Sequence, residues 1–405
     1  MLPVPADHPL IRQENEARVT PLELFFDLVF VFALTQVTAF MADELSWQGI
    51  FRGVLVIMLL WWAWTGYAWL ANVSSAEERP IKLAILAGMA AMFVLALCIP
   101  EAFDDLPGGL RGPVVLAICY ALFRLMHLVM FLIISREDPG LRRQVLRFAF
   151  SAAAGSVVLL VASEFDGWLQ TGLWMLALLA DYVGTALGGF KGWVLPAPGH
   201  FSERHGLIVI VALGESIVAI GVGVAKEPIT WVIIAASVLG LILSSALWWT
   251  YFDVSALLGE HALATEPIQT RARLARNAYS YGHLPLVIGI VLVALGLKEV
   301  LLYVSDRSHH TLTDPLSGVA LAALVGGGVF YLLGHVIFKW LTVHTVSAVR
   351  LGAAVVLLLI FFLIAGRPAL VELAVVAFLV AAAVLIESVL FAESRRKIRA
   401  ELAPH

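Results

Sequence analysis

The chain has 405 residues, of which 61% are hydrophobic and only 14% are charged. Soluble domains are about 45–50% apolar and about 25% charged, so this composition excludes an ordinary soluble fold and a disordered chain. A net charge of −4 without a long basic segment argues against a nucleic-acid partner. Two cysteines, Cys98 and Cys119, are too few for a disulfide framework or a multi-thiolate metal cluster. The composition indicates an all-α polytopic membrane protein.

Twelve segments are long and apolar enough to cross a bilayer, for which a helix needs about 20 residues. In chain order they are 21–42, 49–71, 81–99, 112–134, 143–163, 168–188, 205–224, 229–252, 278–297, 317–339, 349–366 and 368–392. The longest connection, 253–277, contains Pro267 followed by three arginines. It predicts a helix that lies on the membrane surface before the chain turns inward.

The positive residues divide unevenly between the two sides that these spans define. Nineteen of the 26 lysines and arginines fall on the side of the N-terminus, and only six fall on the other side. Positive charge accumulates on the cytoplasmic side of membrane proteins, so both termini are predicted to be cytoplasmic. The basic run Arg395-Arg396-Lys397 in the tail is expected to contact anionic lipid headgroups.

The two halves of the chain share a faint repeat. Tryptophans cluster on the second span and again on the eighth, and Tyr120–Arg124 on the fourth span matches Tyr331–His335 on the tenth. Six-helix halves of equal topology would be related by an axis along the membrane normal. The predicted organisation is an N-terminal cytoplasmic segment at 1–20, six-helix repeats at 21–195 and 200–392, and a basic cytoplasmic tail at 393–405.

Ionisable side chains inside a bilayer are costly, and three acids lie deep in the predicted spans. They are Asp27, Asp181 and Glu215, and the one deep base is Arg124. If Arg124 pairs with one acid, the other two need protons, hydrogen bonds, water or a cation. Such acids are typical of a proton relay or a cation site. The alternative is an internal network of hydrogen bonds and ion pairs that fixes helix packing.

Glu215 has the most distinctive neighbourhood of the three acids. It lies between Gly214 and Ser216 and is followed by Gly221 and Gly223. Small residues let another helix approach closely, and a serine can hydrogen-bond across helices. Ser216 therefore joins the candidate ion or proton site.

Secondary candidates are one further acid and several histidines in the predicted cytoplasmic half or the middle of the spans. They are Glu23, His127, His205, His283 and His335. Histidines can relay protons, but a lone histidine on a helix is more often a satisfied hydrogen-bonding group. The run from His200 to His205 does not have the spacing of a zinc-protease motif, so no metal site is predicted.

The tryptophan clusters have two interpretations. They comprise Trp61, Trp62, Trp64, Trp248 and Trp249. An aromatic belt at the membrane interface is the default, and the wall of a binding cavity is the alternative. Charged residues at helix mouths, such as Glu203 and Asp253, are interpreted as solvated helix ends or caps.

Long strings along the chain resemble one family, that of the bacterial low temperature requirement protein A. Similar strings occupy residues 18–36, 203–217, 248–253, 278–285 and 296–299, and the likeness extends from about 18 to 392. The resemblance implies an integral membrane protein of the bacterial inner membrane. The family name records a cold-growth phenotype and implies a stress response, but it supplies no substrate.

A looser similarity links the first span to the two-repeat potassium channels of lysosomes and bacteria. Phe25-Phe26-Asp27 is similar to their F-S-D motif, with Phe in place of Ser. The second half has His205-Gly206 at the matching place and lacks the Asp. The similarity implies that Asp27 ties helices together on the cytoplasmic side, around a pore lined by the spans 21–42 and 205–224.

Three functions therefore compete. The favoured hypothesis is an ion channel or a proton- or cation-coupled transporter that takes a small ion or small molecule. The alternative is a membrane-embedded binder of a lipid or apolar cofactor, or an enzyme acting on one. The third is a structural or stress-response membrane protein. No cofactor and no enzymatic reaction is indicated, and a homodimer in the lipid bilayer is left open.

Overall fold

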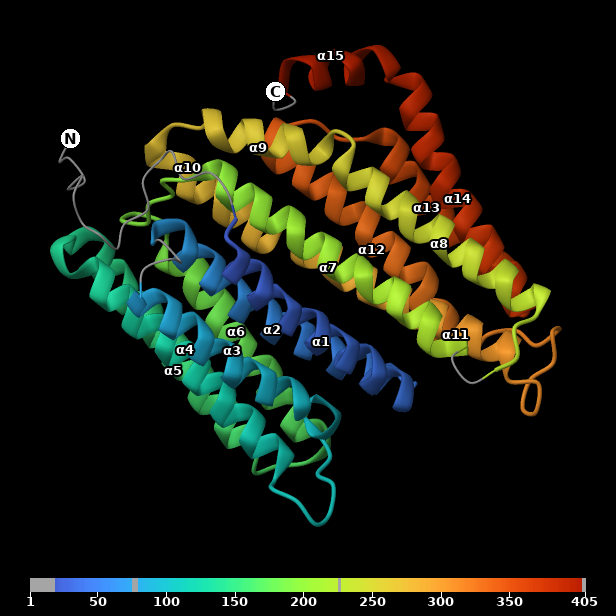
Figure 1. The fold of residues 1–405 in the computed structure, drawn as a ribbon, viewed down its shortest axis with the longest axis horizontal. Coiled ribbons are helices and arrows are strands. Elements are labelled where there is room, and N and C mark those ends of the chain that lie inside the picture. Colours follow the sequence, from blue (N-terminus) through green and yellow to red (C-terminus); the bar gives the residue numbers. More distant parts are fainter. Residues whose placement is uncertain (1–18, 75–78, 225–226, 403–405) are drawn as a thin grey trace. The chain divides into compact units, whose positions relative to one another are not determined.

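The computed structural model describes residues 19–74, 79–224 and 227–402, and every regular element in these ranges is a helix (Figure 1). Eleven of the described helices are long and apolar enough to cross a membrane. The predicted all-α polytopic membrane fold is thus confirmed. The predicted span 349–366 corresponds to a shorter apolar helix, α13 (Ala348–Ile364). Residues 1–18 of the predicted N-terminal segment lie outside the described residues.

The chain forms two compact units, of which unit 1 comprises Met1–Phe40, Arg52–Arg204 and Glu266–Ala275. Within it, α3 packs against α4, α4 against α5, and α5 along α6. Its elements are most of α1 (Pro21–Asp43) and most of α2 (Trp47–Val73), then α3 (Arg79–Leu97), α4 (Gly112–Ile134), α5 (Pro139–Ala162), α6 (Gly167–Gly188), the start of α7 (Pro198–Val224) and α10 (Ile268–Leu274).

Unit 2 comprises Met41–Phe51, His205–Thr265 and Arg276–His405. In this unit α11 packs along α12, α12 against α13, and α8 against α14. The region 253–277 is helical and includes α9, which packs on α12. The elements are the remainder of α7, α8 (Trp231–Phe252), α9 (Ser255–Thr265), α11 (Leu284–Ser305), α12 (Gly318–Val343), α13, α14 (Ala369–Leu390) and α15 (Ala392–Leu402). A π-helix, Ala275–Tyr281, joins α10 to α11.

Several helix starts carry the residues that satisfy free backbone N–H groups. Asp138 accepts hydrogen bonds from the amides of Gly140 and Leu141 at the start of α5, and Ser317 accepts one from Ala320 at the start of α12. Such caps matter because the first turn of a helix has no internal acceptors for its N–H groups. At the other end, α12 stops at His344, whose positive φ of 53° takes the chain out of the helix.

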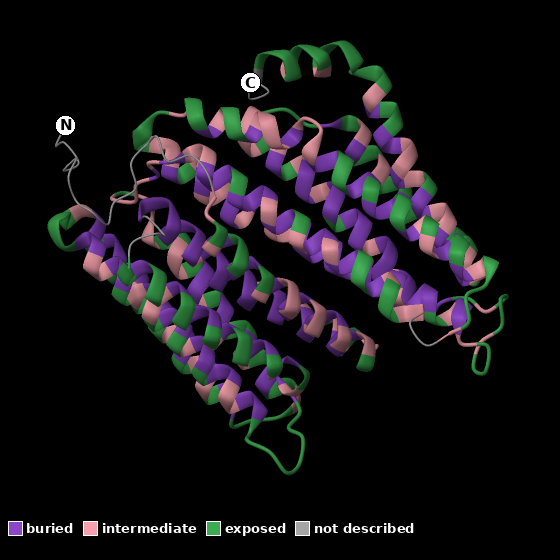
Figure 2. Cartoon of the chain, viewed as in Figure 1, coloured by how far each residue is buried: buried purple, intermediate pink, exposed green. Residues whose placement is uncertain are grey.

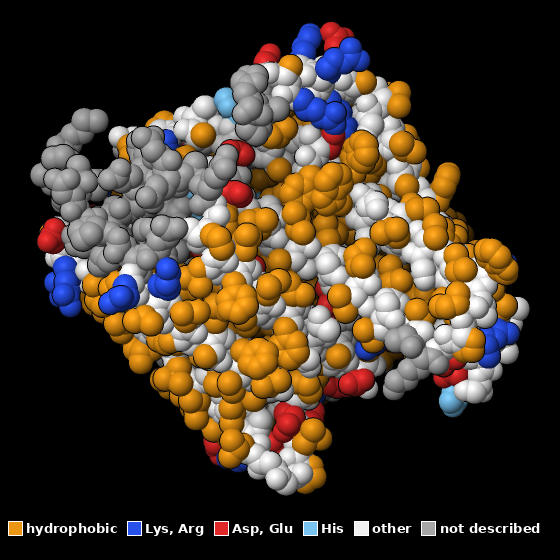
Figure 3. All heavy atoms as spheres, in the orientation of Figure 1, with side chains coloured by type: hydrophobic (Ala, Val, Ile, Leu, Met, Phe, Trp, Pro, Cys, Tyr) orange, Lys and Arg blue, Asp and Glu red, His pale blue; other side chains and the backbone are white. Residues whose placement is uncertain are grey.

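Buried and exposed positions alternate along the helices, and many exposed ones are hydrophobic (Figures 2 and 3). On α3, for example, Leu83, Leu86 and Phe93 are exposed, whereas Ile85 and Met92 are buried. A soluble protein rarely displays contiguous apolar surface of this kind, and here it provides the lipid-facing side of each unit.

Glycines allow the axes of α11 and α12 to approach closely. A Cβ atom on Gly296 would lie 2.5 Å from the Cβ of Leu324, and one on Gly289 would lie 2.6 Å from the backbone nitrogen of Tyr331. A Cβ on Gly327 would in turn lie 2.7 Å from the backbone of Val293. The glycine run in α12 thus serves helix packing, as small residues commonly do in membranes.

A Gly296→Val substitution is expected to force α11 and α12 apart, because its side chain would overlap Leu324. Overpacking of this kind costs about 1–3 kcal/mol. Gly326→Val is the matched control, since a Cβ there has no described atom within 4 Å. Thermal unfolding in detergent should show a lower midpoint for Gly296→Val than for Gly326→Val, and equal midpoints would contradict the packing.

Candidate functional site

A capping box begins α1 and links it to a histidine of α7. The backbone N–H and the hydroxyl of Thr20 both donate to Oε2 of Glu23, at 2.7 and 2.9 Å, and the Glu23 amide points back to the Thr20 hydroxyl at 3.4 Å. This reciprocal pattern is the signature of a helix N-terminus. The other carboxylate oxygen, Oε1, lies 2.9 Å from Nε2 of His200. Glu23 therefore orders the helix that carries Asp27 one turn further on.

Asp27 accepts two buried donors on one oxygen. Nη2 of Arg204 and Nε1 of Trp64 both donate to Oδ1, at 3.0 and 2.9 Å. The guanidinium of Arg204 also lies over the rings of Phe26 and Trp64. No described residue donates to Oδ2 of Asp27, and this atom is buried. One oxygen of the carboxylate is thus fully engaged, and the other is left without a partner.

A second buried pair joins α4 to α6 in the same unit. Nη2 of Arg124 donates to Oδ1 of Asp181 at 3.0 Å, and the hydroxyl of Tyr120 donates to Oδ2 at 2.8 Å. The Arg124 guanidinium stacks on Phe148, with its central carbon 4.8 Å from the ring centroid. Both oxygens of Asp181 are therefore occupied, which distinguishes this carboxylate from Asp27.

The two arginines retain donors that no described protein atom accepts. In both Arg124 and Arg204 the unpartnered atoms are Nε and Nη1, and all four atoms are buried. Buried polar groups are nearly always hydrogen-bonded, to protein or to water. Groups of this kind in a membrane-spanning bundle need water or a polar ligand. The interior of unit 1 is thus charge-compensated by its aspartates but incompletely hydrogen-bonded by its own side chains.

The structure buries Glu215 and Ser216 in the part of α7 that belongs to unit 2, with 2% and 0% of their surface exposed. The expectation of tight glycine packing around them is wrong in part. Apart from the neighbouring backbone of α7 itself, no described atom lies within 4 Å of a Cβ built on Gly214 or Gly221, whereas one on Gly223 would lie 2.8 Å from the Leu301 side chain. Close packing therefore occurs at one end of this glycine series.

The histidines of unit 2 form an aromatic cluster. His205 lies against Tyr279 and His283, with ring centroids 5.1 and 5.2 Å apart. The hydroxyl of Tyr251 lies 2.9 Å from Nε2 of His283, whose Nδ1 is 3.1 Å from the Ala278 carbonyl. Among the described residues, no group of three or more metal-ligating side chains could hold a metal ion. The cluster is built on the π-helix, an element that is frequent at functional sites.

Two expectations about the buried charges need correction. Arg204 falls one residue outside the predicted span 205–224, yet α7 begins at Pro198, so Arg204 lies inside the helix and is 1% exposed. Arg204 is therefore a second buried base. It pairs with Asp27, whereas Arg124 pairs with Asp181. Asp253 is the C-cap residue of α8, as one of its two interpretations had it, but it is not a solvated end, because its carboxylate pairs with Arg395 and Arg399 of α15.

The interface-belt interpretation of the tryptophans is wrong for the first cluster. Trp61, Trp62 and Trp64 are at most 4% exposed, because α2 is buried within unit 1. Trp64 also binds Asp27, so it contributes to the site rather than to the surface. Trp248 and Trp249 are 45% and 46% exposed, as residues of a belt would be.

Sequence reasoning missed a third buried pair, in unit 2. Nε of Arg350 donates to Oε2 of Glu387 at 2.9 Å, and Nη1 contacts Ser255 and Nδ1 of His335, at 3.0 and 3.1 Å. Glu387 lies inside the predicted span 368–392, and an acid within a predicted span is the signal that could have found it. Arg350 lies inside the predicted span 349–366, in the first turn of α13, and was counted only with the positive residues of the N-terminal side.

These features define a polytopic α-helical membrane protein with ion pairs inside its helical units. The chain belongs to the bacterial low temperature requirement A protein (LtrA) family, whose family model matches residues 18–386. It is similar to an uncharacterized protein of Rhizobium meliloti (strain 1021), with 30% identity over 345 residues that cover 81% of this chain and 79% of the relative. The family identified from the sequence strings is confirmed.

The Arg124–Asp181 pair offers a direct test of the buried electrostatics. Removing one partner of a buried ion pair costs about 3–5 kcal/mol, because an uncompensated charge remains. Asp181→Leu and Arg124→Met are therefore each expected to lower stability strongly, and the double variant should lose less than the sum. Unfolding in detergent measures the three values.

The control is the exposed pair Arg111–Glu164, whose side chains are 55% and 59% exposed. Glu164→Gln should cost less than about 1 kcal/mol. Strictly additive losses at Arg124 and Asp181 would show that the two side chains do not stabilise each other.

Proposed function

We propose that the protein moves a small ion, most simply a proton, across the bacterial inner membrane. The observation that carries the proposal is the asymmetric hydrogen bonding of Asp27, with two donors on Oδ1 and none from a described residue on the buried Oδ2. A carboxylate oxygen without a donor is the atom at which a proton adds.

The arrangement suggests how such a proton could be handled. Protonation of Asp27 at Oδ2 would remove the negative charge that compensates Arg204, while Trp64 and Arg204 could still donate to Oδ1. The unsatisfied Nε and Nη1 of Arg204 then provide donors for water or for a substrate anion. An ion pair with a purely structural role is most stable when all its polar atoms are hydrogen-bonded, because each buried polar atom without a partner destabilises the fold. The incomplete hydrogen bonding of Asp27 and Arg204 therefore favours a functional role.

Asp181 has a different role in this proposal. Its two oxygens are held by Arg124 and Tyr120, so it fixes the charge of Arg124 rather than accepting a proton. Glu215, with Ser216 beside it, remains the candidate ion or proton site of unit 2, since both are buried in a spanning helix. The secondary candidate Glu23 contacts His200, and this contact connects the start of α1 to the start of α7.

Proton flux into proteoliposomes, driven by an imposed potassium gradient, tests the proposal. Asp27→Asn keeps an oxygen for Arg204 and Trp64 but removes the titratable group. We expect it to lower flux by about a hundredfold, the scale of losing a positioned proton acceptor. Glu164→Gln, which changes an exposed acid, is expected to keep wild-type flux. Wild-type flux in folded Asp27→Asn would remove Asp27 from the mechanism.

Absence of flux in the folded wild type would instead favour one of the other two functions. A lipid or apolar cofactor that copurifies with the protein would then indicate a binder or a membrane enzyme. A protein with neither flux nor ligand would fit a structural or stress-response role.

Orientation and assembly belong to the same proposal. The lysine and arginine bias supports cytoplasmic termini, and the weak similarity of the two halves supports a repeat of two six-helix units. The basic α15 would rest on anionic lipid at that surface. A homodimer is compatible with these features.

A further inference from the structure

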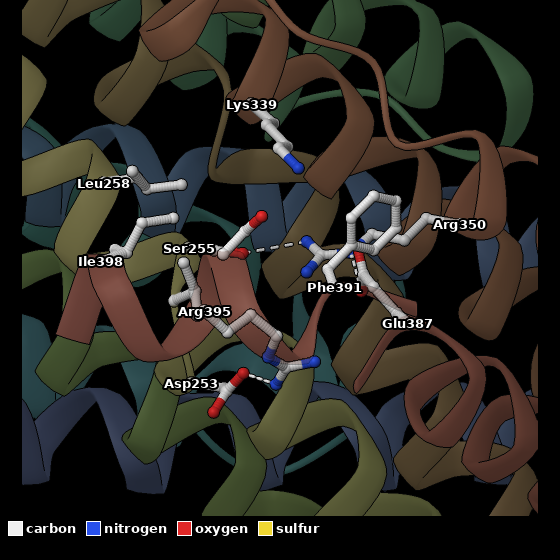
Figure 4. A pocket seen from close by; sticks show the side chains of 11 residues that line it. Asp253, Ser255, Leu258, Lys339, Arg350, Glu387, Phe391, Arg395 and Ile398 are labelled. Atoms are coloured by element: carbon white, nitrogen blue, oxygen red, sulfur yellow. Dashed lines mark hydrogen bonds and ion pairs between the residues drawn. The ribbon is translucent and has the colours of Figure 1, made fainter. Parts of the chain in front are cut away.

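A pocket of about 110 Å³ lies in unit 2 beneath α15 (Figure 4). Its walls come from the end of α8, the start of α9, the ends of α12 and α14, the first turn of α13, and α15 itself. The ends of membrane-spanning helices lie at the depth of the lipid headgroups. The pocket is therefore at a level where phosphate-bearing headgroups and aqueous solutes are both present.

The charges around this pocket do not balance. Glu387 is engaged by Arg350 and by the hydroxyl of Ser347, and Asp253 is engaged by Arg395 and Arg399. The ammonium of Lys339 points into the pocket from α12, and no described residue forms an ion pair or hydrogen bond with it (Figure 4). The pocket thus has an excess of positive charge centred on Lys339.

Arg350, which also lines this pocket, has one nitrogen that is not hydrogen-bonded to a described residue. Nε binds Glu387 and Nη1 binds Ser255 and His335, whereas Nη2 has no hydrogen-bond partner among the described residues. The Arg350 side chain is buried, with 8% of its surface exposed, and its position is fixed by these bonds. Arginine and lysine side chains are the usual protein donors to phosphate oxygens.

Apolar residues flank the charged part of the pocket. Leu258, Phe391 and Ile398 contribute to the lining, and Phe391 is 48% exposed. Its neighbours Val389 and Leu390 are 76% and 65% exposed on the lipid-facing side of α14. This combination of a cationic recess and an exposed apolar rim suits a charged headgroup with acyl chains attached.

We propose that this pocket binds a phosphoryl group, carried by an anionic lipid headgroup or by free phosphate, with Lys339 and Arg350 as its main donors. The site lies in unit 2 and does not depend on the transport proposed for Asp27. The ligand would neutralise the excess positive charge that the protein's own carboxylates leave uncompensated.

Calorimetric titration of the full-length protein in detergent tests the site with three probes. They are short-chain phosphatidylglycerol, inorganic phosphate, and short-chain diacylglycerol, which lacks a phosphate, as the control. We expect saturable binding of phosphatidylglycerol, of phosphate, or of both, and none of diacylglycerol. Tighter binding of phosphatidylglycerol than of phosphate identifies a lipid as the source, and equal affinity identifies free phosphate.

The variants separate the pocket from general attraction to a basic tail. Lys339→Gln should weaken binding by about tenfold or more, the loss of one charged hydrogen bond. Lys339→Arg keeps the charge and should retain most of the affinity. Lys397→Gln removes the same charge from α15 outside the pocket lining, where Lys397 pairs with Glu393, and should lower the affinity less than Lys339→Gln does.

Two results would overturn the proposal. One is the absence of saturable binding for both phosphate-bearing probes in folded wild-type protein. The other is an equal loss of affinity in Lys339→Gln and Lys397→Gln, which would show that the ligand senses only the total charge of the region.

Discussion

The constraint on which this structure depends is the cost of burying a guanidinium among helices that cross a membrane. An ion that leaves water loses several kcal/mol of solvation even after the protein relaxes around it. Three arginines in the spanning helices meet this cost with a carboxylate from another helix: Arg204 with Asp27, Arg124 with Asp181, and Arg350 with Glu387. Each pair joins segments far apart in the chain, so each also fixes which helices are neighbours.

The three pairs differ in how many oxygens of the carboxylate accept hydrogen bonds from the protein. This difference is the basis for assigning their roles. Asp181 and Glu387 have both oxygens engaged. Asp27 has one engaged oxygen and one that lacks a partner among the described residues. A fully bonded carboxylate stabilises its helix pair, whereas a half-bonded one can change its protonation with little rearrangement. In the pocket of unit 2 the positive charges outnumber the negative ones, because no described carboxylate forms an ion pair with Lys339.

The helices were predictable from the sequence because a spanning segment needs only sufficient apolar length, and the eleven long spans lie where hydropathy places them. The pairing of charges was not, because it depends on which faces of different helices meet. Arg204 lies one residue before the predicted span 205–224 but in the second turn of α7, and Arg350 lies in the first turn of α13. Both were treated as charges at helix ends. Trp64 was interpreted as an interfacial residue, since nothing in the sequence shows that its indole reaches Asp27. The acids Asp27 and Asp181 were identified correctly as buried, but their partners required the structure.

Infrared difference spectroscopy of the reconstituted protein tests the central claim most directly, because a protonated carboxylic acid has a carbonyl band that a carboxylate lacks. As the pH is lowered, the account predicts a band that is present in the wild type and in Asp181→Asn and is missing in Asp27→Asn. A band that persists unchanged in Asp27→Asn would contradict the account, since the proton would then reside on another group.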